Sequence, residues 1–144
     1  DTLVEILNLK NTKTFAHTFG NFGAGRIGDI EALSNDEFKK LVEHKLNTNS
    51  IRTNEYFDKL KEINKIAILP GSGTQFIDEI LEEVDVFVTG DISHRYLLKA
   101  DDANMGLLQV GHITTEIPGM KKFVENINKA LKQELEYLYK DFYE

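Results

Sequence analysis

The sequence predicts an α/β fold in which a mostly parallel, mixed sheet is covered by helices on both faces. Three short apolar runs, at residues 66–69, 84–88 and 107–110, are each followed by a polar loop that contains glycine. Apolar residues at helical spacing then follow, first around 76–81 and next around 96–100. This recurrence of strand, loop and helix is typical of βαβ crossovers, whose parallel strands are buried on both sides.

The length and composition fit one folded domain. The chain has 144 residues, of which 41% are hydrophobic and 28% are charged. A chain of this size buries about two thirds of its unfolded surface and needs no covalent staples. Residues 1–144 are therefore expected to form a single α/β domain.

Residue usage and charge exclude several classes of function. The chain has no cysteine, which excludes disulfides, thiolate metal sites and cysteine nucleophiles, and which suits a reducing cytoplasm. Its 17 basic and 24 acidic residues are interspersed and leave a net charge of -7. Without a basic stripe, nucleic-acid binding is disfavoured. No apolar run is long enough to cross a membrane and no signal peptide is recognisable, so we expect a cytoplasmic protein.

The first third of the chain predicts a helical turn, a hairpin and a helix. Residues 2–9 form a short amphipathic pattern, and segments 14–19 and 26–33 read as two strands of a hairpin. Capping side chains at 34–36 then precede apolar residues at helical spacing, which predicts a helix over 36–46.

A glycine-rich stretch, GNFGAGRIG at residues 20–28, joins the two hairpin strands. It matches the G-x-G-x-x-G pattern of dinucleotide-binding loops, but such a loop must open a helix whose N-terminus faces the pyrophosphate. The next predicted helix begins about eight residues after Gly28, so a dinucleotide site is disfavoured. Two interpretations remain open: a tight turn with glycines at positive φ, or a turn that shapes a pocket with Arg26 as an anion contact.

The C-terminal helix is expected from residue 115 to 143. Its apolar stripe consists of Val124, Ile127, Leu131, Leu135, Leu138 and Phe142. Two arrangements fit this stripe: the helix lies across the sheet, or the part that extends past the sheet pairs with another subunit.

The loops that follow the three parallel strands carry the chemistry. Their sequences, GSGT, TGDISH and GHITTE, should meet at the carboxyl edge of the sheet, where open α/β folds bind ligands. His112 leaves the last strand and Glu116 lies one helical turn later, so the two side chains can point the same way. Imidazole and carboxylate together suit Zn, Mn or Fe, whereas the plain alternative is a strand-end histidine and an acid that complements the helix dipole.

The other two loops offer weaker candidates. Asp91 is either a helix cap or an acid that orients a metal-bound histidine, and His94 is a candidate ligand contact. Gly71, Ser72 and Gly73 could cradle a phosphate through their amides, or they form an ordinary turn.

The remaining histidines and the serines add no further site. His44 is expected to face solvent, and His17 is expected to be packed on its strand. No serine follows a nucleophile elbow, and no catalytic residue can be assigned.

Taken in order, GAGRIG, IAILPGSGTQFI, DVFVTGDISH and GHITTE resemble the NIF-three-like family, also labelled GTP cyclohydrolase I type 2 homologues. The resemblance implies an α/β fold, ring-like homo-oligomers and a dinuclear site for two divalent metal ions. It implies that His112 and Glu116 are metal ligands. It also implies that the histidine after TGD is shifted by one position at His94.

The same resemblance implies that the complementary metal ligands are missing here. The family places further histidines and an aspartate in an N-terminal half that precedes DTLVEILNL, the stretch with which this chain starts. Either the chain is a fragment, or another chain supplies these ligands, or the metal site is broken. The start at Asp1 favours the first, so we expect the C-terminal portion of a longer protein.

Three functions follow as expectations. The first is a metal-dependent hydrolase of a nucleotide-like substrate, of the kind that opens the ring of GTP, with Gly71–Thr74 near the phosphate. The second is a non-catalytic, metal-binding oligomer that recruits a protein partner. The third is a metal-free fragment without activity of its own.

Overall fold

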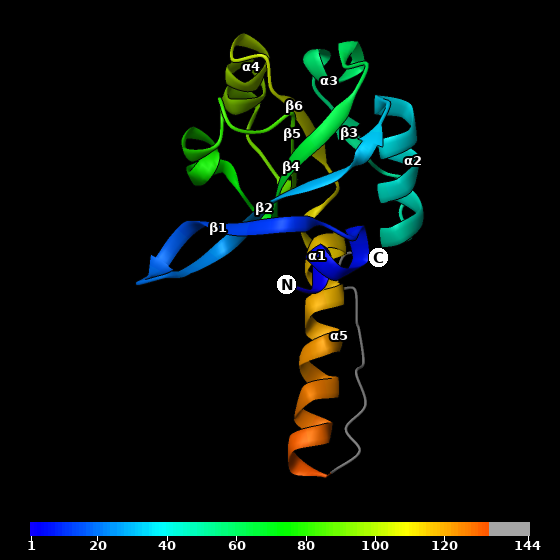
Figure 1. Ribbon diagram of the computed structural model, residues 1–144, viewed down its shortest axis with the longest axis vertical. Coiled ribbons are helices and arrows are strands. Elements are labelled where there is room, and N and C mark those ends of the chain that lie inside the picture. Colours follow the sequence, from blue (N-terminus) through cyan, green and yellow to red (C-terminus); the bar gives the residue numbers. More distant parts are fainter. Residues whose placement is uncertain (133–144) are drawn as a thin grey trace.

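A mixed sheet of six strands carries the fold (Figure 1). The computed structural model describes residues 1–132. Within them the strands run in the order β1-β2-β4-β5-β6-β3 across the sheet. The strands are β1 (Lys10–Phe19), β2 (Phe22–Leu33), β3 (Arg52–Thr53), β4 (Ile63–Ser72), β5 (Val86–Asp91) and β6 (Gly106–Gln109).

The centre of the sheet is parallel, as the repeated strand, loop and helix pattern predicts. β4 pairs with β5 and β5 pairs with β6, both in parallel. The outer pairings, β1 with β2, β2 with β4 and β3 with β6, are antiparallel. The predicted α/β fold with a mixed sheet is confirmed, and its parallel part is the three central strands.

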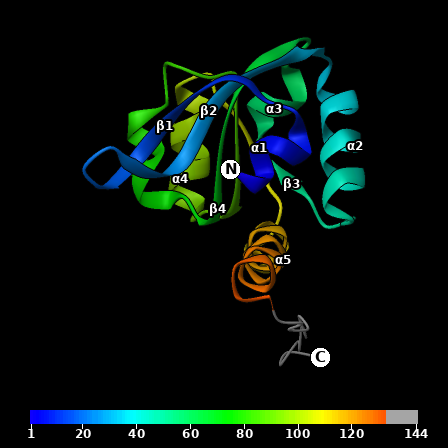
Figure 2. The ribbon, with the colours of Figure 1, turned by 60° about the horizontal axis from the view of Figure 1, so that its bottom comes forward.

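Helices cover both faces, because neighbouring residues of the central strands point to opposite sides. On one face, Ile66 and Ile68 pack with α1 (Thr2–Leu7), α2 (Asn35–Leu46) and α3 (Glu55–Lys59). On the other face, Ala67 and Leu69 pack with the 3₁₀ helix η1 (Thr74–Glu79) and with α4 (His94–Asp102). Figure 2 shows α2 and α4 on opposite sides of the strands.

The helix predicted over 36–46 is confirmed as α2. Phe38, Val42 and Leu46 are its buried residues, and Ser34 and Glu37 form a capping box at its start. The helix predicted around residues 76–81 is wrong in type, because this segment is the short 3₁₀ helix η1. Its N-cap, Gly73, has no side chain to cap an α-helix.

The glycine-rich stretch is mostly strand, so the turn predicted for it is wrong in extent. Of its glycines only Gly20 has a positive φ, 54°, whereas Gly23, Gly25 and Gly28 lie within β2. They make room for the opposite strand: a Cβ on Gly25 would lie 2.2 Å from Cε1 of Phe15. No helix opens on this stretch, because β2 continues to Leu33, so the stretch lacks the helix N-terminus that a dinucleotide-binding loop requires.

His17 and His44 both lie on the surface. His44 is exposed, as expected. His17 is also exposed, so the packed position predicted for it is wrong. Phe15 and Ala16 are both buried, with Ala16 at a φ of 55°, and this break in the alternation turns His17 outward to the Thr14 hydroxyl at 3.2 Å.

The last described helix, α5 (His112–Leu131), points away from the sheet (Figure 1). The arrangement in which it lies across the sheet is therefore wrong, because only its first turns contact β4, β5 and α1. Its exposed apolar residues include Met120, Phe123 and Leu131. Leu135, Leu138 and Phe142 of the predicted stripe lie outside the described residues, and pairing with another subunit stays a prediction.

No helix in residues 1–132 is both long enough and apolar enough to cross a membrane.

Substituting Gly25 by alanine tests why glycine stands in β2. The buried Phe15 ring packs edge-to-face on Phe87 at 6.1 Å and cannot yield, so we expect Gly25→Ala to cost about 1–3 kcal/mol in the free energy of unfolding. Urea denaturation measures the cost. Gly119→Ala, on α5 with no atom within 4 Å of the added Cβ, is the control and should be neutral or slightly stabilising. Equal losses in both variants would contradict the packing argument.

The capping box of α2 predicts a pH-dependent contribution to stability. The Ser34 hydroxyl and amide donate to Glu37 Oε2 at 2.6 and 2.9 Å, and these bonds hold the pKa of Glu37 below its ordinary value of 4.5. A carboxyl group whose pKa is lower in the folded than in the unfolded state adds stability at pH values above its unfolded-state pKa. This stability is lost as the pH falls through the folded-state pKa. Glu37→Gln should therefore destabilise the protein near neutral pH and lose this effect in acid. In a Ser34→Ala background only the amide of residue 34 still donates to Glu37, so urea denaturation should show a smaller difference between neutral and acid conditions.

Candidate functional site

The loops after the three parallel strands meet at one edge, as the topology predicts. Ser72 at the end of β4 pairs with Asp91 at the end of β5. Beyond β6 the ladder continues, because the amides of Val110 and Gly111 donate to Thr89 and Gly90 at 2.9 and 3.1 Å. His112, the first residue of α5, therefore starts directly beside the end of β5.

A β-bulge shapes this edge. Between the pairs Leu69↔Thr89 and Ser72↔Asp91, two residues of β4 stand opposite one residue of β5. The two are Pro70, which lacks an amide for the ladder, and Gly71, whose φ of +71° suits glycine. The bulge brings the backbone of Gly71 under α5: a Cβ there would lie 2.8 Å from Glu116 Oε1 and 3.2 Å from His112 Nε2.

Asp91, His112 and Glu116 form one chain of contacts across the edge. His112 Nδ1 lies 2.7 Å from Asp91 Oδ2, and His112 Nε2 lies 3.3 Å from Glu116 Oε1. All three side chains are about half exposed, so solvent screens their mutual attraction. The predicted pairing of His112 with Glu116 is confirmed, and their metal binding stays a prediction.

This geometry favours one tautomer of His112. An ionised carboxylate only accepts hydrogen bonds, so the 2.7 Å contact places a proton on Nδ1, which donates it to Asp91. In the neutral ring, Nε2 then carries a lone pair that faces a second carboxylate oxygen. Two acceptors at 3.3 Å repel unless a cation, either a proton on Nε2 or a metal ion, lies with them.

The separation of His112 Nε2 and Glu116 Oε1 can be compared with that of two ligands on one metal ion. Two ligands of one zinc ion, each about 2.0–2.2 Å from it at tetrahedral angles, are about 3.3 Å apart. His112 Nε2 and Glu116 Oε1 have this separation, and Asp91 stands where an outer carboxylate orients a metal-bound histidine. Among residues 1–132 no group of three or more histidine, aspartate or glutamate side chains is arranged to hold a metal.

The predicted phosphate contacts of Gly71, Ser72 and Gly73 and the predicted ligand contact of His94 are arranged less favourably than the pair of His112 and Glu116. The Gly71 amide donates to Thr115 Oγ1 at 2.9 Å and is not free for a phosphate. Ser72 is exposed at the edge, whereas Gly73 is buried, with its Cα turned towards Phe87 and Thr89. His94 is exposed at the start of α4 and makes no hydrogen bond or ion pair within the described part of the chain, so the structure does not join it to His112.

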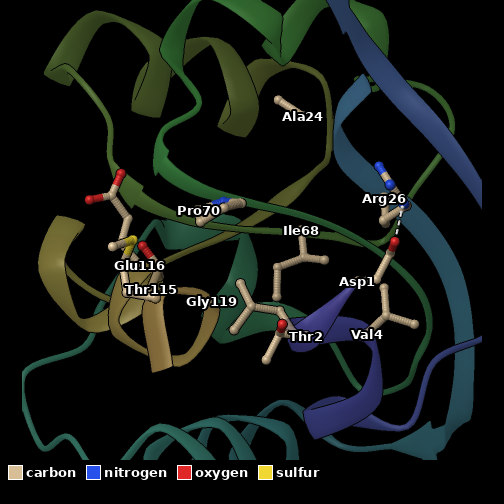
Figure 3. Close-up of a pocket in the computed structure, with 12 residues that line it drawn as sticks. Asp1, Thr2, Val4, Ala24, Arg26, Ile68, Pro70, Thr115, Glu116 and Gly119 are labelled. Atoms are coloured by element: carbon tan, nitrogen blue, oxygen red, sulfur yellow. Dashed lines mark hydrogen bonds and ion pairs between the residues drawn. The ribbon is translucent and has the colours of Figure 1, made fainter. Parts of the chain in front are cut away.

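A cavity of about 340 Å³ adjoins the edge (Figure 3). Ile68 and Pro70 lie between Glu116 on one side and the ion pair of Arg26 with Asp1 on the other. Arg26 donates to Asp1 Oδ1 at 2.8 Å and to the carbonyl oxygens of Gly23 and Gly25 at 2.7 and 2.9 Å. Arg26 thus lies at a pocket, and its guanidinium is held by the protein's own oxygens; its role as an anion contact stays a prediction.

Sequence reasoning missed Thr115, which is only 1% exposed and lies at the centre of this edge. Its signal was present: a residue three after His112 lies on the same side of a helix as His112. The apolar walls of the cavity, Val4 and Met120 among them, come from distant segments and had no local signal.

The chain is similar in sequence to known proteins of one family. The family model of Duf34/NIF3 (NGG1p interacting factor 3) matches residues 1–142. Over 142 residues the chain is 33% identical to a Borreliella burgdorferi protein named GTP cyclohydrolase 1 type 2 homolog, a match that covers 95% of this chain and 53% of the relative. A Methanocaldococcus jannaschii protein of the same name is 31% identical over 140 residues, which cover 94% and 53%. The chain thus spans about half the length of the curated relatives it matches.

Solved structures share the fold. Reduced HcgD from Methanocaldococcus jannaschii is 29% identical with a TM-score of 0.75, over 93% of this chain and 52% of that one. A hypothetical protein from Staphylococcus aureus is 20% identical, also with a TM-score of 0.75, over 93% and 58%, and this likeness concerns the fold alone.

Removing the Asp91 carboxylate tests the assignment of the histidine proton. In the unaltered protein we expect the ¹⁵N chemical shifts of His112 to report a proton on Nδ1. Asp91→Ala removes the acceptor and should turn this signature into a mixture of tautomers. Stability should change by no more than about 1 kcal/mol, because the pair is half exposed. Asp102→Ala, an exposed aspartate at the end of α4, is the control; an unchanged His112 spectrum in Asp91→Ala would refute the assignment.

Proposed function

The chain belongs to the Duf34/NIF3 family, and from this premise and the geometry of the edge we propose that it contributes His112 and Glu116 to a divalent metal site. The observation that carries the proposal is that His112 Nε2 and Glu116 Oε1 lie 3.3 Å apart, while Nδ1 of the same ring lies 2.7 Å from Asp91 Oδ2. Such a pair is stabilised by a cation between its members. A mixed nitrogen and oxygen donor set suits Zn, Mn or Fe.

Two donors do not complete a site, and we propose that the others come from outside this chain. Because the chain spans about half the length of its curated relatives, the whole protein has room for them. Histidine and aspartate side chains in the remaining half would complete a site for two metal ions, in line with the family resemblance.

We propose hydrolysis of a nucleotide-like substrate as the activity of the whole protein. Two relatives bear the name GTP cyclohydrolase 1 type 2 homolog, which supports this substrate class. A bound divalent ion supplies the Lewis acidity that makes water a nucleophile near neutral pH. In this chain, Asp91 keeps the His112 ring oriented, and the apolar cavity beside Glu116 would shelter a planar ring from water. The cysteine-free sequence suits the reducing cytoplasm that we expect for the protein.

A non-catalytic metal-binding oligomer is the second candidate. The exposed apolar side chains of Met120, Phe123 and Leu131 on the projecting α5 favour it, because such a face suits contact with another copy or a protein partner. Metal would then stabilise or regulate the assembly rather than act on a substrate.

Metal analysis of the full-length protein tests the site. We expect His112→Ala and Glu116→Gln each to weaken Zn²⁺ binding by at least about 100-fold, because each removes a direct ligand. His44→Ala and Glu125→Gln, exposed residues away from the edge, serve as matched controls and should bind as the unaltered protein does. Equal affinity in all four variants would refute the site.

Incubation of the same metal-loaded protein with GTP separates the two candidates. A formamidopyrimidine product that disappears with His112→Ala would support the hydrolase. Metal binding without turnover, together with a defined oligomer that dissociates when Phe123→Ser alters α5, would support the second candidate.

A further inference from the structure

The β-bulge in β4 leaves the amide of Gly71 without a ladder partner. Pro70 and Gly71 stand opposite a single residue of β5, so the hydrogen bond that a regular strand would make at Gly71 is lost. A buried amide without a partner is costly, and one side chain of α5 replaces the partner: Thr115 Oγ1 accepts from Gly71 N at 2.9 Å.

The Thr115 hydroxyl also donates towards its own helix. Its oxygen lies 2.7 Å from the carbonyl oxygen of His112 and 3.2 Å from that of Gly111. One hydroxyl group thus accepts from the strand and donates to the first turn of the helix, and it is 1% exposed while doing so. Serine could make the same two bonds, whereas valine, with nearly the same shape, could make neither.

The contact between helix and strands at this point is close. At Gly90 of β5, a Cβ would lie 2.4 Å from the Gly71 carbonyl oxygen, 2.7 Å from His112 Cα and 2.9 Å from Thr115 Oγ1. Only a glycine permits this approach. The first turn of α5 therefore rests directly on the backbone of both β4 and β5.

We propose that Thr115 is the positioning residue of the edge: by bonding the bulge amide of Gly71 it sets the angle at which the first turn of α5 presents His112 and Glu116. Both donors lie within three positions of Thr115 on the same turn. A small rotation of that turn lengthens the contact of His112 Nδ1 with Asp91 Oδ2, because Asp91 belongs to β5 and does not move with the helix. The expected effect on metal binding rests on the proposed function, whereas the positioning of the helix turn by Thr115 does not depend on metal.

The experiment compares Thr115→Val and Thr115→Ser in the full-length protein without metal. The readout is the ¹⁵N signature of His112, which a merely stabilising threonine would not affect. We expect the Nδ1–H signature to persist in Thr115→Ser and to become a mixture of tautomers in Thr115→Val. With Zn²⁺ added, the valine variant should bind about 10- to 100-fold more weakly, and the serine variant as the unaltered protein does.

Thr89→Val is the matched control. Thr89 is a fully buried threonine beside the same bulge, but its hydroxyl donates to the Gly71 carbonyl oxygen, at 3.4 Å, and not to α5. Loss of the Thr89 hydroxyl should lower the free energy of unfolding without changing the ¹⁵N chemical shifts of His112. If Thr115→Val does not fold, Thr115→Ala, which puts no methyl group in the place of the hydroxyl, gives the same readout.

A valine variant that keeps the His112 signature, or a serine variant that loses it as valine does, would overturn the proposal. If the unaltered protein binds no Zn²⁺, the proposed function fails, yet the tautomer comparison still decides the role of Thr115. Loss of the signature in both Thr115→Val and Thr89→Val would also overturn the proposal, because it would show a general loosening of the edge.

Discussion

The parallel pairing of β4, β5 and β6 is the constraint on which the rest of the structure depends. Parallel strands are joined by crossovers that cover a face, so the three central strands are buried on both sides and consist largely of isoleucine, leucine, valine and phenylalanine. The same pairing brings the ends of the three strands to one edge. Gly71, Asp91 and His112 are distant in sequence and become neighbours there.

The edge is held by backbone geometry more than by attraction between charges. Asp91, His112 and Glu116 are half exposed, where an ion pair contributes about 1 kcal/mol or less. The helix backbone fixes the spacing of the two donors, and the bulge with its two close glycines fixes where the helix starts. A site built in this way can leave two acceptors side by side, because the fold and not their mutual energy keeps them together.

Sequence patterns predicted most of the elements, and the failures have specific causes. The apolar runs and the helix α2 were correct because burial dictates their periodicity locally. The glycines of β2 were assigned to a turn because glycine usually marks one, yet here they make room for the opposite strand, and Gly23 and Gly25 lie against Phe15. The direction of α5 could not be predicted, since an apolar stripe shows which face of a helix is buried but not which element it packs against.

The sequence by itself determined the α/β class, the burial of the central strands on both faces, and the one-turn spacing of His112 and Glu116, because each depends on residues close together in the chain. Only the tertiary structure decided that Asp91 lies within hydrogen-bond distance of His112 Nδ1, that Thr115 Oγ1 accepts from the amide of Gly71, and that an apolar cavity lies beside Glu116. These features arise only where strands, a bulge and a helix that are distant in the chain come together. Asp91 and His112 are 21 residues apart, and Gly71 and Thr115 are 44 residues apart. Local pattern carries no information about such contacts, since the angle between a helix and a sheet is set by packing.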